Sequence, residues 1–125
     1  MSNPAEAPTL VHEALRILER WKVEHQDQLS LLDLSNDMHP RMLKRIRQGD
    51  SRLQESHGML ERIRCIFEID RSLQQMFPFN ADMADYWVTT PNLHLQEQSP
   101  LELMLAHGQE GMQTVSQQLN GADTW

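Results

Sequence analysis

The sequence predicts an all-α protein, a compact bundle of roughly six to eight short helices with an N-terminal and a C-terminal half. Apolar residues recur at the spacing of one helix face in every apolar segment, and no segment alternates as a strand does. Hydrophobic residues make up 39% of the 125 residues and charged residues 23%, which is typical of a soluble domain with its own core.

The N-terminal half is expected to hold three helices. The first covers residues 9–21, or continues to Val23, because its apolar side chains share one face. A short apolar cluster at 29–34, followed by a turn-forming segment, predicts a two-turn helix. The third covers 40–48, with a proline in its first turn and Gly49 just past its end.

The C-terminal half begins with the longest predicted helix, which starts at a Ser51 capping box and either continues to Phe77 or breaks near Asp70. A helix carrying Met83, Ala84, Trp87 and Val88 on its apolar side follows. The segment 99–102 has a serine at the N-cap, a proline first in the helix and a glutamate three residues after the serine, so a helix starts there. A last amphipathic helix is expected over 111–119.

The residues that carry chemistry in enzymes do not form a recognisable site. The six histidines are scattered, and no two have the four-residue spacing that brings two imidazoles together on one helix face around a metal. Cys65, the single cysteine, lies among apolar residues and is expected to be a buried, inert thiol. We therefore expect no catalytic residue, no metal and no cofactor.

The location is expected to be the cytoplasm. One cysteine excludes an internal disulfide and fits a reducing compartment. Residues 1–10 contain neither a basic segment nor an apolar run, so no signal peptide is expected, and no apolar stretch is long enough to span a membrane.

The net charge of −7 is distributed unevenly. All 11 lysines and arginines occur at or before Arg71, whereas the residues beyond it include acidic side chains and no basic one. Such a C-terminal half is a poor surface for nucleic acid. It either suits a protein partner with a basic cleft or keeps the domain soluble.

The predicted helices over 29–34 and 40–48 have the size of a helix-turn-helix, joined by a tight polar turn. A basic patch lies on the second helix, with Met42, Leu43 and Ile46 as its apolar contacts. The patch either contacts DNA or is an ordinary solvated face. Its members, with the last at the flank, are Arg41, Lys44, Arg45, Arg47 and Arg52.

Short motifs follow one another in order through the second half of the chain. They are Leu60-Glu61-Arg62-Ile63, Ile69-Asp70-Arg71-Ser72-Leu73, Phe77-Pro78, Tyr86-Trp87, Thr90-Pro91-Asn92, Ser99-Pro100-Leu101-Glu102-Leu103-Met104, and Gly108 to Gly111 before Val115. This series is similar to the toxin-binding domain of the MbcA/ParS/Xre antitoxins, and the resemblance covers about residues 51–121. The preceding residues resemble the Xre-like helix-turn-helix half of the same family.

The resemblance implies an Xre-like helix-turn-helix region over 1–50 and a toxin-binding domain over 51–125. It implies a type II antitoxin that neutralises a RES-domain toxin, an NAD-consuming or ADP-ribosylating protein, and that regulates its own operon by binding operator DNA. The segment 87–119 would dock on the toxin and close access to its NAD pocket. The implied toxin-binding residues are Trp87, Pro91, Asn92, Ser99, Pro100, Leu101, Glu102, Gln109, Glu110, Gln113 and Gln117.

Three details accompany this interpretation. Family members usually have a glycine shortly before the Ser-Pro pair, where this chain has Gln96, Glu97 and Gln98. A homodimer is expected, because helix-turn-helix proteins pair to match two half-sites. Trp125 is either disordered or a docking residue.

The alternative functions are a DNA-binding regulator without a toxin partner and, third, a small helical enzyme.

Overall fold

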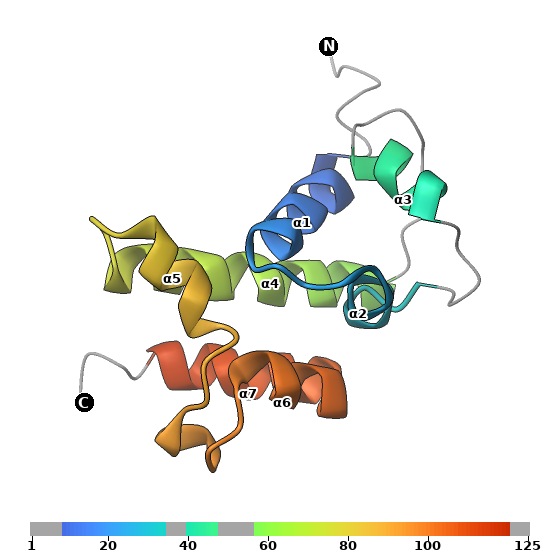
Figure 1. The fold of residues 1–125 in the computed structure, drawn as a ribbon. Coiled ribbons are helices and arrows are strands. Elements are labelled where there is room, and N and C mark those ends of the chain that lie inside the picture. Colours follow the sequence, from blue (N-terminus) through green and yellow to red (C-terminus); the bar gives the residue numbers. More distant parts are fainter. Residues whose placement is uncertain (1–8, 35–39, 48–56, 121–125) are drawn as a thin grey trace. The chain divides into compact units, whose positions relative to one another are not determined.

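A computed structural model describes residues 9–34, 40–47 and 57–120. Within these ranges every named element is a helix (Figure 1). The all-α prediction is confirmed. The described ranges contain seven α-helices and one short 3₁₀ turn. These are α1 (Thr9–Arg20), α2 (His25–Leu31), α3 (Pro40–Arg47), α4 (His57–Met76), α5 (Ala81–Trp87), η2 (Leu93–Leu95), α6 (Pro100–His107) and α7 (Gln109–Asn120).

The chain divides into two compact units, residues 1–63 and 64–125, and helix α4 contributes to both. In the described part of the chain, no helix combines the length and the apolar character needed to cross a membrane.

The core of the first unit is built on α1. The predicted apolar stripe is confirmed, because Leu15 and Leu18 are completely buried and Trp21 is nearly so. Helix α3 packs against α1 and directs the completely buried Ile46 inward. This packing leaves the opposite side of α3 available to solvent.

Helices α1 and α2 both end in a left-handed residue that is not glycine. Lys22 has a φ of 61°, and the N–H of Val23 donates to the carbonyl of Leu18 over 3.0 Å. Asp33 has a φ of 57°, and the N–H of Leu34 donates to the carbonyl of Leu29 over 2.8 Å. This is the Schellman arrangement, in which a left-handed residue reverses the chain so that the next N–H satisfies a carbonyl of the last turn.

The predicted start of the second helix was wrong. Helix α2 begins at His25, because the buried Gln28 donates to the Val23 carbonyl over 2.9 Å and holds the chain into an earlier first turn. The tight polar turn predicted between the two helices falls on residues 35–39, which lie outside the described residues.

An arginine closes the C-terminal end of α2. Arg62 of α4 donates from Nη1 to the carbonyls of Ser30 and Leu31, over 3.1 and 3.3 Å. A guanidinium at this position satisfies carbonyls that have no partner inside the helix. Arg62 consequently stabilises the first unit.

In the second unit, α4 continues unbroken through Asp70, so of the two predicted alternatives the single long helix is confirmed. Its buried side includes Cys65, as expected, together with Ile69 and Leu73. The Ser51 capping box lies outside the described residues.

Two hydrogen bonds join α4 to α7. The Ser116 hydroxyl donates to the Glu68 carboxylate over 3.3 Å, and Ser72 donates to Asn120 over 3.4 Å. They tie α7 to α4 at two points along its length.

Helices α6 and α7 follow one another almost without a loop. Gly108 has a φ of 60° and ends α6, as predicted, and α7 begins at Gln109, two residues before the predicted start. The helices approach closely at Gly111, where an added β-carbon would collide with the Leu103 carbonyl group and lie 3.0 Å from Met104 Cα. A glycine is therefore required at position 111 for this packing.

Candidate functional site

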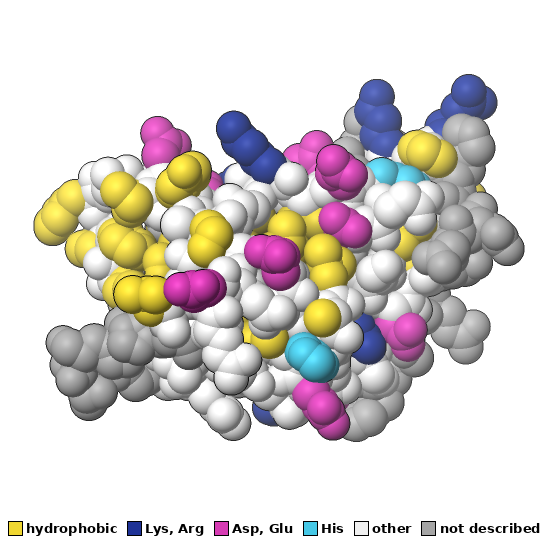
Figure 2. Space-filling model, turned by 60° about the horizontal axis from the view of Figure 1, so that its bottom comes forward, with side chains coloured by type: hydrophobic (Ala, Val, Ile, Leu, Met, Phe, Trp, Pro, Cys, Tyr) yellow, Lys and Arg dark blue, Asp and Glu magenta, His cyan; other side chains and the backbone are white. Residues whose placement is uncertain are grey.

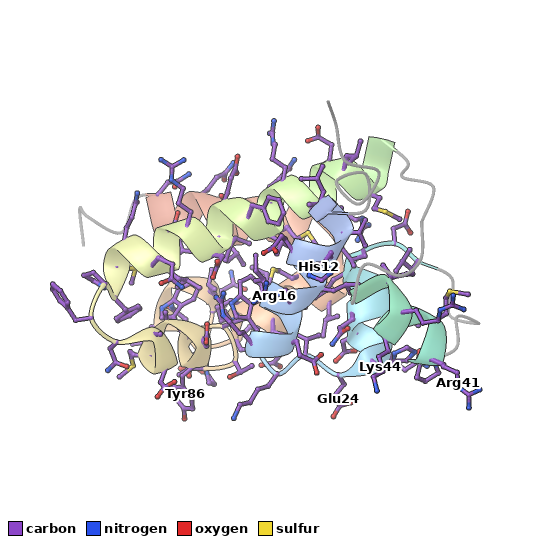
Figure 3. The ribbon with its side chains drawn as sticks, turned by 90° about the horizontal axis from the view of Figure 1, so that it is seen from above. His12, Arg16, Glu24, Arg41, Lys44 and Tyr86 are labelled. Atoms are coloured by element: carbon purple, nitrogen blue, oxygen red, sulfur yellow. The ribbon has the colours of Figure 1, made fainter. Side chains whose placement is uncertain are left out.

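Helix α3 carries the basic patch on its exposed side. Arg41, Lys44 and Arg45 are all exposed, and their spacings of three and four residues place them on one face. Figure 3 shows Arg41 and Lys44 pointing away from the helix. Because Ile46 fixes the other face against α1, these three cations form a rigidly presented positive surface.

The rest of the patch is less completely described. The side chain of Arg47 and the whole of Arg52 lie outside the described residues, as does the side chain of Leu43. Met42, expected to make apolar contacts, is 40% exposed. It lies one residue from Arg41 on the open side of the helix, so it adds apolar area beside the cations.

The start of α6 has the predicted capping geometry. Glu102 N donates to Ser99 Oγ, and Ser99 N donates to Glu102 Oε1, each over 3.1 Å. Ser99 and Pro100 are buried, whereas Glu102 is exposed. The first turn is thus fixed by its own residues, and the glutamate carboxylate remains at the surface while it caps the helix.

The end of α5 is joined to this turn by a backbone hydrogen bond. The N–H of Leu101 donates to the carbonyl of Val88 over 2.9 Å. Trp87 and Leu101 are half-buried and Pro91 is exposed. The structure therefore brings Trp87, Pro91 and the Ser99 capping box into one locally fixed segment.

The loop between η2 and α6 closes on Asn92. Its N–H donates to the Gln98 carbonyl over 3.0 Å, and its own carbonyl accepts from the N–H groups of Leu95 and Glu97, over 3.0 and 2.9 Å. Gln96 and Glu97 have φ values of 59° and 67°. Both residues therefore adopt the left-handed backbone conformation that favours glycine, although neither is a glycine.

Helix α7 exposes one polar face and buries the other. Glu110, Gln113 and Gln117 are exposed and lie three and four residues apart, whereas Gln109 is half-buried at the start of the helix. The opposite face is buried through Met112 and Val115. The four predicted residues therefore divide into three on an open face and one at its edge.

An exposed apolar surface that sequence analysis missed lies at the start of α5. Phe79 is 99% exposed, Tyr86 66% and Met83 45%, so the expectation that Met83 is buried was wrong. Figure 2 shows hydrophobic side chains gathered on the left of this face, over the end of α4 and α5, with acidic side chains beside them. The three-residue spacing of Met83 and Tyr86 was the available signal, because it separates them from the buried stripe of Ala84 and Val88.

Comparison with known proteins identifies one part of the chain. Residues 72–123 match the family described as the antitoxin Xre/MbcA/ParS C-terminal toxin-binding domain. No curated protein and no solved structure is significantly similar to the chain. The matched segment contains the Ser99 capping box, the Asn92 loop and the exposed face of α7. Residues 72–123 of this chain are therefore similar to the toxin-binding domain of the Xre/MbcA/ParS antitoxin family.

Proposed function

We propose that this chain is the antitoxin of a type II toxin-antitoxin system and neutralises a RES-domain toxin that consumes NAD or transfers ADP-ribose. The match of residues 72–123 to a toxin-binding domain carries the proposal. The segment 87–119 docks on the toxin and closes access to its NAD pocket. The toxin supplies the chemistry, and the antitoxin contributes binding without a catalytic group or cofactor, in the cytoplasm.

The build of the second unit supports docking through this segment. The Ser99 capping box, the Leu101 to Val88 hydrogen bond and the closed Asn92 loop fix the backbone before a partner arrives. A surface whose backbone is already ordered loses less conformational entropy on binding than a flexible one. In this proposal Trp87, Ser99 and Pro100 mainly hold the segment in shape, whereas its exposed side chains contact the toxin.

The test is co-expression of the full chain with the RES-domain toxin encoded beside it. The parent chain is expected to restore growth, and Gln113→Lys combined with Gln117→Lys is expected to abolish protection, because two cations then stand at the interface. Both side chains are exposed, so folding is retained. The matched control is Gln26→Lys with Ser30→Lys, which adds the same charge at the same spacing on α2.

Each outcome of this test is informative. The assignment is supported if the parent and the control both protect the cells and the α7 variant does not. Full protection by the α7 variant removes that face from the interface. Failure of the parent chain to protect contradicts the antitoxin function itself.

We further propose that residues 1–50 bind operator DNA and that residues 51–125 bind the toxin. Arg41, Lys44, Arg45 and Arg47 approach phosphates and base edges, with Arg52 at the flank. The exposed cationic face of α3 supports this assignment. A homodimer matches two operator half-sites, and light scattering at tens of micromolar that reports a monomer would contradict that state.

A further inference from the structure

Phe79, Met83 and Tyr86 form an exposed apolar surface, which we call the α5 anchor surface. Helix α5 packs inward through Ala84 and Val88, both completely buried. Met83 and Tyr86 lie three residues apart on another side, and Tyr86 points outward from α5 in Figure 3. Ala84 and Val88 therefore carry the inward packing, and much of the Met83 and Tyr86 side chains stays exposed to solvent.

Phe79 lies at a position where an apolar side chain normally has a local partner. Asn80 is the N-cap of α5, and its Oδ1 accepts from the N–H of Met83 over 3.0 Å. A hydrophobic residue just before an N-cap commonly packs against the fourth helical residue, here Ala84, as a hydrophobic staple. Ala84 is completely buried and Phe79 is 99% exposed, so that staple is not formed. An exposed aromatic ring that is close in sequence to the exposed Met83 and Tyr86 is typical of an interaction site.

The charges around the surface indicate what kind of partner fits it. Asp82 is exposed within the surface and Asp85 is half-buried beside it. No lysine or arginine occurs anywhere in the sequence beyond Arg71. A partner that offers an apolar pocket rimmed by lysine or arginine is complementary to this arrangement.

A second copy of this chain is a poorer fit. Pairing two α5 anchor surfaces places Asp82 and Asp85 of one copy near the same residues of the other. Residues 72–123 of neither copy contain a lysine or arginine that could compensate these charges. Like charges brought together at an interface are unfavourable. Charge therefore favours a different protein over self-association.

We infer that Phe79, Met83 and Tyr86 anchor the toxin, inserting into an apolar pocket that is rimmed by lysine or arginine on the toxin surface. This inference rests on the proposed toxin-binding function and adds a contact before the segment 87–119. The three anchor residues lie within the matched residues 72–123. Aromatic side chains at the centre of an interface commonly carry most of its binding energy.

The test measures the affinity of the purified RES-domain toxin for the full chain and for Phe79→Ser combined with Tyr86→Ser. The variant is expected to bind at least about thirtyfold more weakly, the effect of removing one interface hot spot. Both side chains are largely exposed, so circular dichroism and the melting temperature should match the parent. The matched control is Leu10→Ser with Leu60→Ser, which removes two exposed apolar side chains from the first unit and should bind like the parent.

A second variant tests the charge component. Asp82→Asn is expected to slow association and to reduce its dependence on salt, because a charge at the rim of an interface acts mainly on the association rate. If the Phe79 and Tyr86 double variant binds the toxin as tightly as the parent, the inference is overturned. The proposed function is then still supported by the α7 variant. Loss of a dimer in that variant with unchanged toxin affinity also overturns it, because the surface would then be a self-interface. No toxin binding by the parent chain removes the proposed function and this inference together.

Discussion

Gly111 of α7 faces the backbone carbonyl of Leu103 in α6 so closely that the position has no room for a β-carbon. Replacement by alanine forces the two helices apart, because the obstacle is backbone and not the end of a flexible side chain. We expect Gly111→Ala to lower the free energy of unfolding by about 1–3 kcal/mol, the usual effect of overpacking. Urea denaturation followed by circular dichroism measures it.

Gly58 of α4 provides the control for that experiment. A β-carbon there would meet nothing within 4 Å, so Gly58→Ala adds helix propensity without a collision. We expect it to raise the free energy of unfolding by up to about 1 kcal/mol. Equal effects of the two substitutions would show that the α6 and α7 approach is not constrained at Gly111.

Ser99→Ala tests the capping box at the start of α6. The substitution removes the acceptor for Glu102 N and is expected to lower the free energy of unfolding by about 1 kcal/mol. Ser99→Thr keeps a hydroxyl acceptor and should lose less. Thermal melting of both variants measures the difference, and identical melting temperatures would contradict a capping role for the hydroxyl.

The loop before α6 gives a prediction about backbone strain. Glu97 has a φ of 67°, which glycine adopts freely and a β-branched residue adopts with difficulty. We expect Glu97→Gly to raise the free energy of unfolding by up to about 1 kcal/mol and Glu97→Val to lower it by about 1 kcal/mol. Denaturant titration of the pair decides, and stabilisation by valine would contradict the left-handed conformation.

The basic face of α3 is tested by the salt dependence of DNA binding. Lys44→Ala with Arg45→Ala is expected to weaken binding to the upstream promoter. The slope of log affinity against log salt should fall by roughly 0.9 for each phosphate that the variant no longer neutralises. Fluorescence anisotropy across a salt series measures both quantities. Arg64→Ala with Arg71→Ala removes the same charge from exposed positions of the second unit and should change the slope less.

Most helices were predictable because their apolar periodicity and capping residues act locally. The Ser99 capping box and the glycine at the end of α6 are examples, since a few adjacent side chains determine each of them. The ends of α1 and α2 were harder to place, because Lys22 and Asp33 adopt left-handed conformations usually signalled by glycine. The early start of α2 depends on Gln28, whose hydrogen bonds reach back to Val23 and Glu19.

The candidate site was only partly predictable for a related reason. Sequence spacing correctly put Arg41, Lys44 and Arg45 on one exposed face. Periodicity alone grouped Met83 with the apolar stripe of α5, whereas packing uses only the narrower stripe of Ala84 and Val88. The complete exposure of Phe79 depends on how the chain leaves α4, and no local sequence rule specifies that.

The burial of Cys65, the single cysteine of the chain, gives the protein an internal reporter of its own opening. A thiol reagent modifies this sulfur only in molecules in which the region around α4 has opened. The rate of modification therefore records how often the second unit opens, without an introduced label. Slower modification in the presence of the proposed toxin partner would measure, in the same tube, how strongly complex formation protects this chain from unfolding.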